Sequence, residues 1–139
     1  MAQTVRDVMS PAPREISADD TIERAAQVMR DEDIGDVLVM DGDRLLGILT
    51  DRDIVVRALA EDLDPGTTPV DTIFSGDLVT ITPDTIADDA ARVMRERAVR
   101  RLPVVENGQV LGVVSIGDLA KAVDRHSGLA SISAAPPNN

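Results

Sequence analysis

Two short stretches carry the side chains of this sequence that could do chemistry. Residues 47–53 (GILTDRD) and 112–118 (GVVSIGD) each place a hydroxyl residue three positions before an aspartate. The glycine and the aliphatic residues after it predict the end of a buried strand, and the hydroxyl residue predicts the start of a helix. The unpaired N–H groups and the positive dipole of a helix N-terminus suit the anionic oxygens of a ligand. Both stretches are therefore candidate binding sites.

A capping box accounts for the same spacing without any ligand. In that arrangement the hydroxyl of Thr50 or Ser115 accepts a backbone N–H of the first helical turn, and the carboxylate of Asp53 or Asp118 reaches back to the cap residue. A single copy would leave the two interpretations about equally open. Because the sequence contains the pattern twice in the same context, a ligand site is favoured.

The elements that must position these residues also occur twice. Val5 aligns with Val70, and the alignment continues without a gap to Asp53 and Asp118. Each copy predicts a short helical turn, a strand, an amphipathic helix, a hairpin with Asp-Gly or Asn-Gly, and a last helix. One such unit covers only one face of a small sheet. We therefore expect an α/β (α+β) fold of two β-α-β-β-α repeats that pack sheet to sheet about a pseudo-twofold axis.

The boundaries of the repeats follow from this alignment. We expect the first repeat at residues 1–63, the second at residues 64–127, and a flexible tail at residues 128–139, with the two repeats forming one module. A hydroxyl or carboxylate cap with an acid three residues later predicts that the amphipathic helices begin after Asp20 and Thr85.

The composition argues against several classes of protein. The formal net charge of -11 does not suit a surface for nucleic acid, which needs clustered cations. No cysteine is present, so there is neither a disulfide framework nor a thiolate site. The apolar runs are too short to span a membrane, and the first residues lack the pattern of a signal peptide. We expect a cytoplasmic protein that binds neither nucleic acid nor membranes.

Enzymatic activity would need a nucleophile, a base or a metal cluster. The single histidine, His126, lies at the edge of the predicted tail. We find no Walker loop, nucleophile elbow or zinc spacing. Asp41 and Asp43 in the first hairpin lack the further ligands of a calcium loop. We therefore expect no catalytic residues, no metal site and no catalytic cofactor.

The order of the motifs resembles a tandem pair of CBS domains, also called a Bateman module. The resemblance rests on residues 4–9 (TVRDVM), residues 101–105 (RLPVV) and the two Gly-x-x-Thr/Ser-x-x-Asp stretches. It extends over roughly residues 4–125, and the chain looks like the small stand-alone CBS-pair proteins of bacteria. The family implies a regulatory fold that binds AMP, ADP, ATP or S-adenosylmethionine in clefts between the repeats. It also implies a homodimer formed through helices.

The resemblance also implies roles for individual residues. Asp53 and Asp118 would hold ribose hydroxyls, and Thr50 and Ser115 would contact phosphate. A carboxylate suits a diol donor, whereas a hydroxyl can donate to phosphate. The implied primary cleft consists of Ser115, Asp118, Arg101, Arg100, Ser10, Arg14, Ile34 and Gly35. The implied secondary cleft consists of Thr50, Asp53, Asp36, Ser75, Leu78, Val79 and Val99.

The two copies differ in charge where the phosphates would lie. Residues 95–101 read RERAVRR, whereas the matching residues 30–36 read RDEDIGD. The resemblance makes Arg101 a phosphate ligand, and its counterpart Asp36 would repel phosphate. A solvated surface is the simpler interpretation of such charge runs. On the sharper interpretation, the primary cleft takes a phosphorylated adenosine and the clefts are inequivalent.

Two functions remain open for the chain. The first is a non-enzymatic regulatory module that binds an adenosine-containing ligand and signals to an effector protein that the sequence does not name. The alternative is a protein-interaction or stress-related dimer whose nucleotide clefts are vestigial. In both cases we expect a homodimer, because apolar residues such as Leu59 and Val123 lie on helices near the edge of the module.

Overall fold

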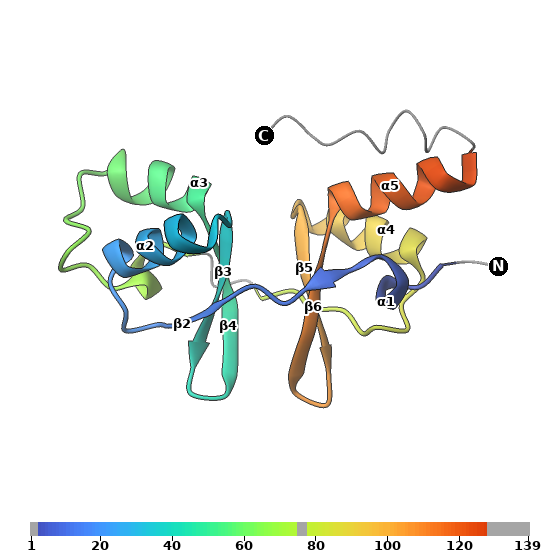
Figure 1. The fold of residues 1–139 in the computed structure, drawn as a ribbon, viewed down its shortest axis with the longest axis horizontal. Coiled ribbons are helices and arrows are strands. Elements are labelled where there is room, and N and C mark those ends of the chain that lie inside the picture. Colours follow the sequence, from blue (N-terminus) through green and yellow to red (C-terminus); the bar gives the residue numbers. More distant parts are fainter. Residues whose placement is uncertain (1–2, 75–77, 128–139) are drawn as a thin grey trace. The chain divides into compact units, whose positions relative to one another are not determined.

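The chain forms two compact units (Figure 1). The structure, a computed structural model, describes residues 3–74 and 78–127, with the backbone alone for residues 123–127. Unit 1 consists of Met1–Ala12 and Val79–Asn139, and unit 2 is Pro13–Leu78. The predicted tail at residues 128–139 lies outside the described residues.

Unit 2 is built on a three-stranded sheet in which β3 is the central strand. β2 pairs with β3 in parallel, and β4 pairs with β3 antiparallel through a hairpin. Unit 2 also contains the helix α2, the short helices α3 and η1 (a π-helix) after β4, and the 3-10 helix η2. The elements are β2 (Glu15–Ser17), α2 (Ile22–Glu32), β3 (Asp36–Asp41), β4 (Arg44–Thr50), α3 (Asp51–Asp53), η1 (Ile54–Leu59) and η2 (Val70–Thr72).

Unit 1 also has a three-stranded sheet, but its central strand is β6, the second strand of the hairpin. β1 and β5 both pair with β6 antiparallel. The β5–β6 hairpin turns at Asn107 and Gly108, which both have positive φ, as the predicted Asn-Gly turn requires. The elements are α1 (Val5–Val8), β1 (Ser10–Pro11), α4 (Ala87–Arg97), β5 (Arg101–Glu106), β6 (Gln109–Ser115) and α5 (Ile116–Ser127). The two small sheets and their helices confirm the predicted α+β class.

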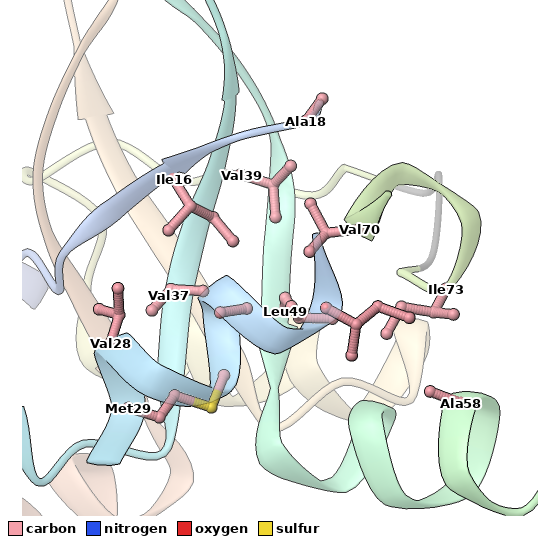
Figure 2. Packing of buried hydrophobic residues seen from close by; sticks show 12 residues of the cluster. Ile16, Ala18, Val28, Met29, Val37, Val39, Leu49, Ala58, Val70 and Ile73 are labelled. Carbon is pink, nitrogen blue, oxygen red and sulfur yellow. The ribbon is translucent and has the colours of Figure 1, made fainter. Parts of the chain in front are cut away.

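Each unit combines the N-terminal segment of one repeat with the sheet of the other. α1 and β1 come from the first repeat but belong to unit 1, where Val5 is fully buried. In return, η2 comes from the second repeat, and Val70 and Ile73 lie in the core cluster of unit 2 (Figure 2). We call this arrangement the segment exchange. The sequence repeat and the compact unit are different divisions of the chain, and the boundaries at residues 63 and 127 stay a prediction about the repeat.

The segment exchange affects how α2 begins. The prediction of Asp20 as its cap is wrong by one residue, because Thr21 is the N-cap and its Oγ1 accepts the Arg24 N–H at 3.1 Å. The Ile22 N–H donates to the carbonyl oxygen of Thr68 at 3.0 Å. A carbonyl from the second repeat thus satisfies the first N–H of a helix in the first repeat.

The same exchange affects α4. The predicted cap Thr85 is also wrong by one residue, since the N-cap is Ile86, which offers no side-chain cap. The Ala87 N–H instead donates to the carbonyl oxygen of Gln3 at 2.9 Å. The helix therefore needs no polar cap residue at Ile86, because the exchanged segment supplies the acceptor.

Candidate functional site

Ser115 and Asp118 form a capping box at the junction of β6 and α5. The Ser115 N–H donates to Asp118 Oδ2 at 2.9 Å, and the Asp118 N–H donates to Ser115 Oγ at 3.1 Å. Both side chains are half-buried. The cap engages one carboxylate oxygen, Oδ2, in a backbone hydrogen bond. Capping and ligand binding are therefore compatible at Asp118, because Oδ1 is outside the cap.

A hydroxyl from the exchanged segment lies at the second oxygen of Asp118. Ser10 Oγ donates to Asp118 Oδ1 at 3.3 Å, and its distance to Oδ2 is 3.5 Å. Ser10 is in β1, opposite Val113 of β6, so strand pairing places it beside the start of α5. The structure thus brings two predicted site residues from different repeats into contact within unit 1.

The approach of β1 to β6 depends on Gly112. A Cβ at this position would lie 3.0 Å from Met9 Sδ and would be still closer to the carbonyl oxygen of Ser10. Gly112 pairs with Pro11 in the ladder. Only a residue without a side chain lets the two backbones come this close. The glycine that begins the motif therefore positions Ser10.

Two arginines lie beside Ser115. Arg101 begins β5 and is directly opposite Ser115 in the β5–β6 ladder, so their side chains leave the same face of the sheet. The carbonyl of Arg100 accepts the N–H of the first residue of α5 at 2.9 Å. Both arginines are exposed. Five predicted residues of the primary cleft therefore gather around one helix start: Ser10, Arg100, Arg101, Ser115 and Asp118.

The other copy of the motif, at residues 47–53, has the same cap but a different neighbour. The Thr50 N–H donates to Asp53 Oδ2 at 2.9 Å, and the Asp53 N–H donates to Thr50 Oγ1 at 3.1 Å. Asp53 Oδ1 lies 3.8 Å from Arg57 Nε. Arg57 Nη1 also donates to the carbonyl oxygen of Ile73 at 3.4 Å. An arginine thus contacts the oxygen of Asp53 that corresponds to the Ser10 contact on Asp118.

The surroundings of Thr50 are acidic. Asp36 is opposite Thr50 in the β3–β4 ladder, as Arg101 is opposite Ser115. Asp51, the first residue of α3, donates its N–H to the carbonyl oxygen of Gly35 at 2.9 Å. Asp51 and Arg57 were missed as site residues. Comparison of the aligned positions could have found them, because unit 1 has apolar residues there, Ile116 and Ala122.

The remaining predicted residues divide between the units. Of the primary set, Arg14, Ile34 and Gly35 belong to unit 2, and Arg14 lies 3.9 Å from Glu32. Of the secondary set, Val79 and Val99 belong to unit 1, and the exposed Leu78 belongs to unit 2. Ser75 lies outside the described residues. The grouping of these residues with Asp118 or Asp53 stays a prediction.

Neither a metal cluster nor a membrane span occurs in the described part of the chain. No three His, Cys, Asp or Glu side chains in it are arranged to hold a metal ion. Within the same residues, no helix has both the length and the apolar character needed to cross a membrane.

Comparison with known families shows a repeated domain. The family model described as CBS domain matches residues 5–59 and again residues 70–125. The CBS domain-containing protein YhcV of Bacillus subtilis is 38% identical over 117 residues, which cover 84% of this chain and 83% of that protein. Hypoxic response protein 1 of Mycobacterium tuberculosis is 35% identical over 125 residues, which cover 89% and 87% of the two chains.

Solved structures share the fold. A protein with CBS domains from Burkholderia ambifaria matches with a TM-score of 0.78 and 30% identity, covering 87% of this chain and 93% of that one. Hypoxic Response Protein I, solved with two coordinated zinc ions, matches with a TM-score of 0.74 and 36% identity, covering 86% and 98%. Those ions are a property of that protein; the present sequence has no cysteine and one histidine.

One match was solved with adenosine compounds. The CBS domain pair of protein MJ0100, in complex with 5′-methylthioadenosine and S-adenosyl-L-methionine, has a TM-score of 0.79 and 24% identity, covering 91% of this chain and 99% of that one. At this level of identity the likeness concerns the fold.

Proposed function

We propose that this chain, which belongs to the CBS domain family and carries the domain twice, is a non-enzymatic regulatory module that binds an adenosine-containing ligand at Asp118. CBS pairs as a class are regulatory rather than catalytic. The candidate ligands are AMP, ADP, ATP and S-adenosylmethionine. The proposal includes a cytoplasmic location and an effector protein that reads the bound state.

The observation that supports this function best is the hydroxyl contact on Asp118. Ser10 Oγ donates to Asp118 Oδ1 at 3.3 Å, so the carboxylate already accepts a hydroxyl donor on the side away from the cap. Ribose carries two neighbouring hydroxyls of the same chemistry, and a carboxylate accepts both. A ligand diol would take the place of the Ser10 hydroxyl or share Asp118 with it.

The charges around Asp118 support a phosphorylated ligand. α5 extends over Ile116–Ser127, so its N-terminus carries the full partial charge of a helix dipole. Arg100 and Arg101 flank this terminus, and guanidinium groups match phosphate oxygens with paired donors. Phosphate would lie toward the arginines and Ser115, and ribose toward Asp118.

Calorimetry with adenosine, AMP, ADP, ATP and S-adenosylmethionine tests the function. We expect about one high-affinity nucleotide per chain, lost in Asp118→Asn, because the amide offers a weaker acceptor for the diol. Asp53→Asn is the matched control, since it changes the equivalent residue of the other motif. Absence of binding by every compound would remove the sensor function, and equal losses in the two variants would remove the assignment to Asp118.

One observation favours the alternative function, which is a protein-interaction or stress-related dimer with vestigial clefts. The π-helix η1 exposes Val55, Val56 and Leu59 by 55%, 44% and 74%. Val123 was the other residue predicted to lie at the dimer interface, and its side chain is not among those that the structure describes. A row of exposed aliphatic side chains on one helix is typical of an interface.

We expect a homodimer that uses this helix. Light scattering should give twice the chain mass at micromolar concentration, and Leu59→Glu should shift the mass toward the monomer because it places a charge in an apolar contact. Ala26→Glu, at an exposed position of α2, adds the same charge elsewhere and should leave the dimer intact. A monomer at all concentrations would contradict the expectation.

A further inference from the structure

We propose that Arg57 is a specificity-determining residue that competes with a ribose diol for Asp53, so that the motif at residues 47–53 binds a neutral nucleoside more weakly than it would without this arginine. The inference rests on the proposed function, because it assumes that a carboxylate in this motif can hold ribose. It concerns contacts within unit 2 alone.

The contacts of the two aspartates differ most at Oδ1, the oxygen outside the cap. In both motifs Oδ2 accepts the N–H of the hydroxyl residue at 2.9 Å. At Asp118, Oδ1 accepts a neutral hydroxyl from Ser10. At Asp53, Oδ1 faces the guanidinium of Arg57 at 3.8 Å. A diol arriving at Asp118 exchanges one hydroxyl for another, whereas at Asp53 it must displace a cation from a carboxylate.

Arg57 is anchored in this position by a second contact. Its Nη1 donates to the carbonyl oxygen of Ile73 at 3.4 Å, and Ile73, only 2% exposed, lies in the core cluster of unit 2. The side chain therefore bridges the helix after β4 and the exchanged segment. In this ion pair the Asp53 side chain is 22% exposed and the Arg57 side chain is 50% exposed. Solvent therefore screens the pair in part, and its contribution lies in the range of exposed ion pairs.

Unit 1 has no such bridge at the matching position. The residue aligned with Arg57 is Ala122 of α5, which is 4% exposed and carries no charge. At this position, one helical turn after the aspartate, the two motifs therefore differ by the charge of one arginine. Neutral adenosine is the probe that isolates its effect, because it carries a diol but no phosphate that could gain from the arginine.

The test measures adenosine binding by NMR titration in an Asp118→Asn background, which removes the proposed primary site. Arg57→Met keeps the length of the side chain and removes its charge. We expect it to tighten adenosine binding about twofold, the equivalent of the roughly 0.5 kcal/mol that an ion pair between residues four apart on a helix contributes. Adding Asp53→Asn to this variant should abolish the gain.

The control is Arg52→Met, which removes the same charge from the neighbouring exposed arginine of α3. A gain in Arg52→Met equal to that in Arg57→Met would overturn the inference, because it would reflect net charge alone. So would the absence of any gain in Arg57→Met in both the wild-type and Asp118→Asn backgrounds. Loss of the proposed function has a different signature: wild-type protein that binds no adenosine, or binds it unchanged in Asp118→Asn.

Discussion

We expect Gly112→Ala to lower the free energy of unfolding by about 1–3 kcal/mol, which is the usual range for a side chain forced into a filled site. The added Cβ would collide with the carbonyl oxygen of Ser10 and would lie 3.0 Å from Met9 Sδ. Backbone cannot rotate away as a flexible side chain can, so β1 must move off β6. Chemical denaturation of the purified protein measures the loss.

A matched control is available at Gly117, in α5. A Cβ added at Gly117 would lie 3.6 Å from Ser115 Oγ, which is an ordinary contact distance. Gly117→Ala should therefore stabilise the protein, by about 0.5–1 kcal/mol, because alanine loses less backbone freedom than glycine in a helix. Destabilisation of both variants to the same extent would show that the close approach of β1 is not the cause.

Arg101→Ala is expected to weaken AMP or ATP by about 1.5–3 kcal/mol, the range for hydrogen bonds to charged groups. The reason is the position of Arg101 opposite Ser115, beside the N-terminus of α5. Adenosine, which has no phosphate, should bind nearly unchanged. Calorimetry with AMP and adenosine on the same variant separates the phosphate contribution from that of the nucleoside.

Asp36→Ala is the matched control for this variant. Asp36 takes the same place opposite Thr50 that Arg101 takes opposite Ser115, but it belongs to the other unit. Its removal should leave the Asp118 site nearly untouched. Equal losses of AMP affinity in the two variants, or two identical sites per chain, would contradict the asymmetry that the charges predict.

Much of the fold could be predicted because the relevant signals are local. Apolar periodicity marks α2 and α4, and the Asn-Gly dipeptide marks the β5–β6 turn. The capping pairs of Thr50 with Asp53 and Ser115 with Asp118 were predictable for the same reason, since three residues of spacing define them.

Contacts distant in sequence could not be predicted in this way. The contact between Ser10 and Asp118 depends on the segment exchange, and no local pattern shows which sheet a short strand such as β1 joins. The N-cap of α2 was misplaced by one residue because Asp20 and Thr21 are both good cap residues, and Thr21 forms the cap. The N-cap of α4 was misplaced because the carbonyl of Gln3, distant in sequence, accepts the first helical N–H in place of a side-chain cap. The hydrogen bond from Arg57 to the carbonyl oxygen of Ile73 is likewise a contact between residues distant in sequence, which no local pattern shows.

The segment exchange also sets an order for folding on the ribosome. Unit 2 is a continuous stretch, Pro13–Leu78, so it can close as soon as η2 has been synthesised. Unit 1 joins residues at both ends of the chain, and Val5 can be buried only after β5 and β6 exist. Contacts this far apart in sequence form slowly, because a long loop must close first. The N-terminal segment that carries Ser10 can therefore pair with β6 only late in synthesis, after most of the chain has been made.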